Sequence, residues 1–231
     1  MLVIGALAVA LAVINPITIH AVPVTPDYDT FGPLAGATFG GSGIPNHSVA
    51  VSTSGGVTLG LEAHQRYVGP DLVDNGAGTY WANPGPGTPA NLSTWNFAFY
   101  GLGSASAPGA TARLFYDFDP AIGNDQSTLG YVNLGLLGLT PGQDSWNLGF
   151  SFLDTAIPGV VVPPTYPSFN PNAVGEYSFV LEAYNRDGQT IGRSAINVNT
   201  SAVPDSGSTF ASLGLASLGL LAFRKFTLVT A

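Results

Sequence analysis

The chain has 231 residues and a formal net charge of −8, with 14 acidic residues against 6 Lys and Arg. Phosphate binding needs clustered basic residues, so this balance argues against a nucleic-acid partner. The chain has no cysteine, which excludes a disulfide framework, a thiolate metal site and a cysteine nucleophile.

The N-terminal residues have the pattern of a secretory signal peptide. Residues 2–14 are apolar and uncharged, Asn15 and Pro16 break a helix, and Ala21 ends a plausible small-residue cleavage site. The usual basic residues at the start are missing. The alternative interpretation of this apolar run is a buried N-terminal helix or strand. We predict that residues 1–21 are a removable signal and that the mature chain begins at Val22.

Residues 22–202 are predicted to form one all-β domain, because apolar and polar residues alternate with period two along several segments. These segments are 57–67, 94–99, 111–119, 145–152, 176–185 and 189–198, with shorter ones at 48–52, 79–81 and 131–136. Arg186-Asp187-Gly188 is expected to close a hairpin between the last two long segments. Gly- and Pro-rich stretches at 27–43, 83–91 and 158–171 should be loops.

The number and spacing of these segments favour an antiparallel β-sandwich of about seven to nine strands, with a closed barrel as the alternative. Alternation places Trp95 and Trp146 on core-facing sides of their strands. It places Glu62, His64 and Arg66 on the solvent side of the 57–67 segment.

Catalytic motifs are missing from the sequence, which contains no Gly-x-Ser-x-Gly elbow and no His-Glu-x-x-His pair. Only His47 and His64 lie in the predicted domain. We expect His64 to lie on a solvated strand face rather than to act as a base. The sequence therefore predicts a protein that is not an enzyme.

Four oxygen-bearing side chains follow each other closely at the end of one predicted strand: Asp117, Asp119, Asn124 and Asp125. Carboxylate and amide oxygens are the ligands that Ca²⁺ prefers. The spacing is not that of an EF-hand loop, and an Asp/Asn-rich turn without metal is the other interpretation. One hypothesis is thus that a calcium ion stabilises this loop, and the other is that the protein has no cofactor.

Three aromatic residues stand in or beside Gly/Pro/Asn-rich stretches where alternation does not require them in the core: Tyr80, Trp81 and Tyr166. Exposed rings next to Asn and Asp are typical of carbohydrate-binding surfaces. The alternative is that these rings cap the open ends of the sandwich.

The C-terminal residues 203–231 combine three features in a fixed order. A short polar motif comes first and consists of Val203, Pro204, Asp205, Ser206 and Gly207. An uncharged apolar run at 208–223 follows, and with Ser206 and Gly207 it spans about 27 Å as a helix, close to the roughly 30 Å of a bilayer core. Arg224 and Lys225 end it, and such basic flanks stay on the cytoplasmic side.

This tail resembles the PEP-CTERM class of bacterial sorting signals in its VPDSG variant. The resemblance implies export, retention by a transmembrane helix at about 208–223, and processing by an exosortase-type membrane transpeptidase in a bacterium that makes exopolysaccharide. A plain C-terminal anchor or a buried helix is the alternative. The sequence thus predicts a non-enzymatic surface or matrix protein associated with exopolysaccharide. The alternative is a carbohydrate-binding module, with stabilisation by calcium as a further hypothesis.

Overall fold

The structure is a computed structural model that describes residues 22–67 and 70–201. Within these residues the regular structure consists of 12 β-strands in two sheets and one short 3₁₀ turn, η1 (Gln126–Thr128). This confirms the predicted all-β class. The predicted signal peptide at 1–21 and the tail at 203–231 lie outside the described residues. In the described part of the chain, no helix has the length and apolar character needed to cross a bilayer.

The first sheet has five strands, all antiparallel, in the order β1-β2-β3-β6-β9. Its strands are β1 (Thr30–Gly32), β2 (Val49–Ser54), β3 (Val57–Gln65), β6 (Trp95–Gly103) and β9 (Gly142–Trp146). The strongest alternating segments of the sequence, β3 and β6, lie at its centre.

The second sheet has seven strands in the order β10-β8-β7-β11-β12-β5-β4. Its strands are β4 (Val73–Asp74), β5 (Thr79–Trp81), β7 (Thr111–Tyr116), β8 (Gly130–Leu136), β10 (Val161–Val162), β11 (Gly175–Tyr184) and β12 (Thr190–Thr200). The β5 strand runs parallel to β12, so the prediction of a purely antiparallel fold was wrong at this pair. The strand count also exceeds the prediction, because β1, β4 and β10 are too short to show alternation.

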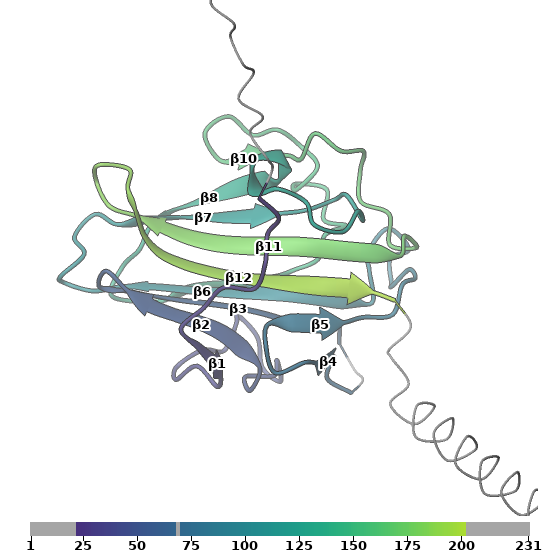
Figure 1. Cartoon of the computed structure of the whole chain (residues 1–231), viewed down its shortest axis with the longest axis horizontal. Coiled ribbons are helices and arrows are strands. Elements are labelled where there is room, and N and C mark those ends of the chain that lie inside the picture. The colour runs from purple at the N-terminus through teal and green to yellow at the C-terminus, as the bar shows by residue number, and fades with distance from the viewer. Residues whose placement is uncertain (1–21, 68–69, 202–231) are drawn as a thin grey trace, which may run out of the picture.

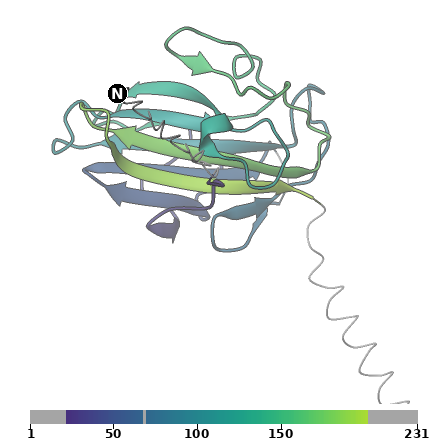
Figure 2. The ribbon, with the colours of Figure 1, turned by 45° about the horizontal axis from the view of Figure 1, so that its top comes forward.

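The two sheets pack face to face around one core, as the predicted β-sandwich requires (Figures 1 and 2). Leu59 and Leu61 of β3 contribute to this core from one sheet, and Phe179 of β11 contributes from the other. The rings of Phe97 and Phe179 stack with their centroids 4.5 Å apart. Alternate residues of each strand thus bury their apolar side chains between the layers.

The outer face of the five-stranded sheet is also covered. Residues 33–48 form a loop whose Leu34 and Phe39 pack on Val49, Val51 and Tyr100 of the outward side. Polar side chains fix this loop, since Asn46 bonds to the main chain of Leu34 and the Gln143 side chain accepts the amides of Thr38 and Phe39 at 2.8 Å.

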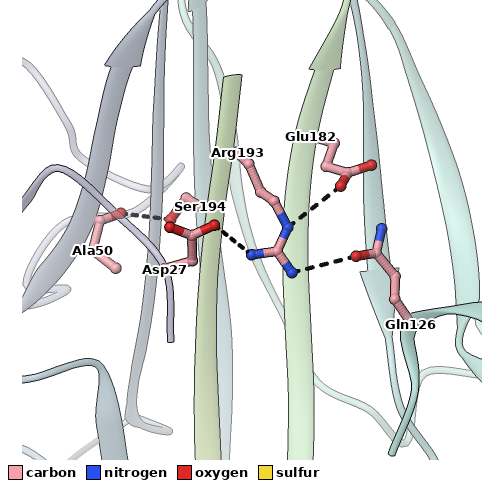
Figure 3. A network of polar contacts seen from close by, with 6 residues as sticks. All are labelled: Asp27, Ala50, Gln126, Glu182, Arg193 and Ser194. Atoms are coloured by element: carbon pink, nitrogen blue, oxygen red, sulfur yellow. Dashed lines mark hydrogen bonds and ion pairs between the residues drawn. The ribbon is translucent and has the colours of Figure 1, made fainter. Parts of the chain in front are cut away.

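A smaller cover lies on the outer face of the seven-stranded sheet, where Val24 and Leu129 pack on Val180 and Ala195. Arg193 of β12 holds this cover (Figure 3): its guanidinium lies 2.7 Å from Asp27, 3.4 Å from Glu182 and 3.3 Å from Gln126. The next residue, Ser194, points the opposite way and donates to the Ala50 carbonyl of the other sheet at 2.8 Å. Two neighbouring residues of β12 therefore bind the outer cover on one face and the five-stranded sheet on the other.

These covers correct one prediction. Glu62 and His64 do project from the outward side of β3, but they are 1% and 5% exposed rather than solvated. Residues 41–44 of the covering loop border the space beside His64. A loop rich in Gly and Pro gives no periodic signal that it will cover a sheet, which is why alternation alone misplaced these side chains.

The strand predicted at 145–152 was wrong in its second half. β9 ends at Trp146, and residues 150–155 form turns. The buried side chain of Asn147 accepts the amides of Ser93 and Gly149 and donates to the carbonyls of Ser93 and Trp95, which takes the place of the strand ladder. The hairpin at Arg186-Asp187-Gly188 is confirmed, with Gly188 at a φ of 76°.

Trp95 is buried as predicted. Trp146 packs on the core with an edge of its ring against Phe97 and Phe99. Of the predicted loops, 83–91 holds no strand, whereas 27–43 and 158–171 carry the short strands β1 and β10.

Candidate functional site

One hollow brings together residues that the sequence analysis proposed for two different ligands. It has a volume of about 410 Å³. Its lining contains the four residues of the calcium hypothesis and one ring of the carbohydrate hypothesis: Asp117, Asp119, Asn124, Asp125 and Tyr166. Gly123, Thr128, Thr165 and Pro167 complete the lining. We call it the Tyr166 hollow.

The hollow forms where β7 ends and β11 begins. The chain leaves β7 at Tyr116, and the amide of Glu176 donates to the Pro120 carbonyl at 3.1 Å. The Glu176 side chain in turn accepts the amide of Gly123 at 3.2 Å. These bonds hold the 117–125 loop against the start of β11, so its polar side chains have fixed positions.

Asp117 forms the floor of the Tyr166 hollow and is 2% exposed. One carboxylate oxygen accepts the amide of Asp119 at 2.8 Å, and the other accepts the Asn124 side-chain amide at 2.9 Å. Burial raises the pKa of Asp117 to about 6, and these hydrogen bonds, which favour the charged form, limit the rise.

The Asn124 amide nitrogen lies among three oxygens. It donates to Asp117 at 2.9 Å, to the Asp119 carbonyl at 2.8 Å and to the Ala121 carbonyl at 3.1 Å. A ring of oxygens around one point is how a protein surrounds a hard cation. Here a neutral amide group takes the central place, so calcium would have to displace it.

The hydrogen bonds of Asp125 go to other partners. Its carboxylate accepts the Ser127 amide at 2.8 Å, as an N-cap of η1, and also accepts the Val22 amide. These bonds lower the pKa of Asp125, the Ser127 contribution being the largest. Among the described residues no group of three or more His, Asp and Glu side chains is arranged to hold a metal ion. The calcium hypothesis stays a prediction, with Asn124 as its central residue.

The three aromatic candidates have different positions. Tyr166 is 43% exposed at the rim of the hollow. Trp81 is half-buried on β5 and is not part of that lining. Tyr80 is 1% exposed, and its hydroxyl donates to the Ser48 carbonyl. Its ring packs in the core because β5 alternates too, so the prediction of Tyr80 as a sugar-binding surface ring was wrong.

A second polar site was not expected from the sequence. On the outer face of the five-stranded sheet, His64 of β3, Asn96 of β6 and Ser145 of β9 border a hollow of about 330 Å³. The His64 Nε2 atom lies 2.8 Å from the Ser145 hydroxyl, and Asn96 donates to that hydroxyl at 3.0 Å. We call this second site the His64 hollow. Its polar residues come from three strands that are distant in sequence, so only the pairing of these strands reveals the site.

Comparison with protein-family models found no match for the chain, and comparison with curated proteins found none either.

Proposed function

We propose that this chain is an exported bacterial surface or extracellular-matrix protein, whose β domain is first anchored by the C-terminal tail and then released from it by an exosortase-type transpeptidase. The ordered motif, apolar run and basic pair at 203–225 support this proposal. β12 ends at Thr200, so Val203 follows the last strand.

Within this proposal the Tyr166 hollow binds a polysaccharide, which in such a bacterium would be the cell's own exopolysaccharide. One observation supports a sugar as the ligand. The exposed ring of Tyr166 meets Asp119, Asp125 and Thr128, which come from a different part of the chain. The C–H face of a sugar packs on an aromatic ring, while its hydroxyls bond with carboxylate and hydroxyl oxygens. This binding role needs no catalysis.

The binding proposal is tested by sedimentation of the full-length protein with exopolysaccharide from the producing bacterium. Tyr166→Ala should weaken binding about tenfold, which corresponds to roughly 1.4 kcal/mol. Tyr166→Phe keeps the ring and is the matched control that should retain most of the affinity. Equal binding by the Ala variant and the wild type would contradict a role for this ring. Trp81→Ala tests whether a second ring takes part.

The sorting proposal needs its own experiment, in the native bacterium. Pro204→Ala combined with Asp205→Ala should leave the domain exported but held in the membrane at full length. Deletion of residues 208–231 should instead release soluble domain, because the apolar run is then absent. Asp187→Asn, in the exposed hairpin turn, is a control that should be processed normally. Wild-type mature protein that still ends at Ala231 would show that the tail is a permanent anchor.

A further inference from the structure

We propose that Ser145 and His64 form a catalytic dyad that hydrolyses short-chain carboxylic esters in the His64 hollow. The hollow lies on the outer face of the five-stranded sheet and is distinct from the Tyr166 hollow. Arg66, Asn96 and Phe150 share its lining with the dyad. The activity does not depend on polysaccharide binding at Tyr166.

The hydrogen bonds of His64 fix which ring nitrogen acts as a base. Its Nδ1 atom lies 2.9 Å from the Gln65 carbonyl oxygen, which can only accept a hydrogen bond. Nδ1 must therefore carry the proton, and Nε2 is left as an acceptor. The Ser145 hydroxyl, 2.8 Å away, donates to Nε2. A hydroxyl that donates to an imidazole, itself oriented by a third group, is the arrangement of an activated nucleophile.

The other side of the serine is equally well defined. Asn96 donates to the Ser145 oxygen at 3.0 Å, while its own side-chain oxygen accepts from Asn147 at 2.9 Å. Asn147 is buried and bonded to the main chain of Ser93 and Trp95. This row of amides holds the Ser145 oxygen in one position and makes Asn96 a positioning residue.

The surroundings keep the imidazole neutral, as a general base requires. His64 is 5% exposed. Burial lowers its pKa, and the Gln65 carbonyl and the charge of Asp71 act in the opposite direction. Glu62, two residues earlier on the same side of β3, is buried with its pKa raised to about 9, so it adds no negative charge beside the ring at neutral pH. Neutral His64 can accept the serine proton.

The hollow also contains a donor for the negative charge that develops on an ester carbonyl oxygen. The Arg66 guanidinium lies over the Tyr67 ring, 4.5 Å from its centroid. Its Nη1 atom is buried and has no hydrogen-bond partner among the described residues. A preformed cationic donor stabilises an oxyanion. We assign Arg66 this role.

The reaction then proceeds by acyl transfer in two steps. The Ser145 oxygen attacks the ester carbonyl carbon while its proton moves to Nε2 of His64, and that proton passes to the departing alcohol oxygen. Water then attacks the acyl-serine, giving a proton to Nε2, which returns it to the serine oxygen as the carboxylic acid leaves. No cofactor is consumed. A hollow of about 330 Å³ has room for an ester with a short acyl chain.

The test uses the full-length protein with a fluorophosphonate probe and with p-nitrophenyl acetate. Mass spectrometry should find the probe on Ser145 and not on Ser106, whose hydroxyl pairs with Ser104 rather than with an imidazole. Ser145→Ala should abolish labelling and ester hydrolysis, and His64→Asn should lower kcat at least about 100-fold. Arg66→Met should lower kcat about 10- to 100-fold while labelled protein still forms slowly.

Labelling of the wild type does not depend on the folding of any variant. Ser106→Ala should hydrolyse the ester as fast as the wild type, because Ser106 lies outside the dyad. No adduct on Ser145 of the folded wild-type protein, or ester hydrolysis by the wild type no faster than that by Ser145→Ala, would overturn the proposal. Polysaccharide sedimentation with Ser145→Ala should remain at the wild-type level, which separates this test from that of the Tyr166 hollow.

Discussion

Glu62 makes the stability of the domain depend on pH in the direction opposite to that of most carboxylates. Its side chain is 1% exposed, and its Oε1 atom has no hydrogen-bond partner among the described residues. Burial raises its pKa from 4.5 to about 9, with a smaller contribution from the negative charge of Asp71. The folded state therefore keeps Glu62 protonated at neutral pH, whereas the unfolded state ionises it.

The sign of the effect follows from proton counting. Above pH 4.5 Glu62 is mostly ionised in the unfolded chain but keeps its proton in the folded chain. Its contribution to the free energy of unfolding therefore falls as pH rises, until Glu62 ionises in the folded state near pH 9. Each pH unit in this window costs about 1.4 kcal/mol. At pH 7 the cost is about 3 kcal/mol, and it depends on the unfolded-state pKa rather than on how far the folded-state value exceeds 7.

Glu62→Gln removes the ionisable proton and keeps the shape of the side chain. We expect the variant to gain little over the wild type at pH 4.5 and about 3 kcal/mol at pH 7, measured by urea unfolding at several pH values. Asp187→Asn removes one carboxylate from an exposed turn and is the charge-matched control, which should show no such widening. A stability difference between Glu62→Gln and wild type that stays constant from pH 5 to 8 would refute the reasoning.

Three further predictions concern Arg193, Gly149 and the calcium hypothesis. Arg193→Met should lower the free energy of unfolding by about 1–3 kcal/mol in chemical denaturation, because charge-assisted hydrogen bonds to the outer cover are lost; an unchanged urea midpoint would contradict this. Gly149→Ala should lower the free energy of unfolding by about 2 kcal/mol or more, because its Cβ would lie 2.1 Å from a main-chain oxygen. Gly142→Ala is the control and should lower it far less in the same measurement, because the nearest atom to its Cβ would be 3.9 Å away. Saturating Ca²⁺ should leave the melting temperature of the wild type unchanged, because the Asn124 amide nitrogen already lies among the oxygens of Asp117, Asp119 and Ala121. A rise of several degrees that Asp117→Asn abolishes would show that calcium displaces this amide.

The sequence predicted the long strands well because their alternation reports directly on burial between two layers. β3, β11 and β12 begin and end within two residues of their predicted limits, whereas β6 continues to Gly103, four residues beyond its predicted end. It failed where a loop covers a sheet, since the 33–48 segment buries Phe39 without any periodic pattern. It also failed after Trp146, because side-chain hydrogen bonds of Asn147 replace the ladder bonds there. Leu148 is still buried and Phe150 and Phe152 are partly buried, so the apolar pattern continues without a strand.

The candidate sites likewise divide into features that a local sequence pattern predicts and features that depend on distant packing. Asp117, Asp119, Asn124 and Asp125 are close in sequence, so their common location at one hollow was predictable. Tyr166 joins them only through the packing of a distant loop, and the sequence had assigned it to a separate hypothesis.

The pairing of His64 with Ser145 depends on the register of β3, β6 and β9, which no local pattern specifies. The only signals in the sequence were a histidine and a serine at outward positions of separate strands.

The last strand also determines how the domain would respond to a pulling force. β12 is bonded along its length to β11 and, near its end, to β5, and the chain continues from Thr200. Tension applied to the following segment along the strand axis would load the ladder to β11 in shear, so that many main-chain hydrogen bonds resist at once. An edge strand would instead peel away one bond at a time. A pull transmitted through β12 would therefore meet the combined resistance of its hydrogen bonds to β11.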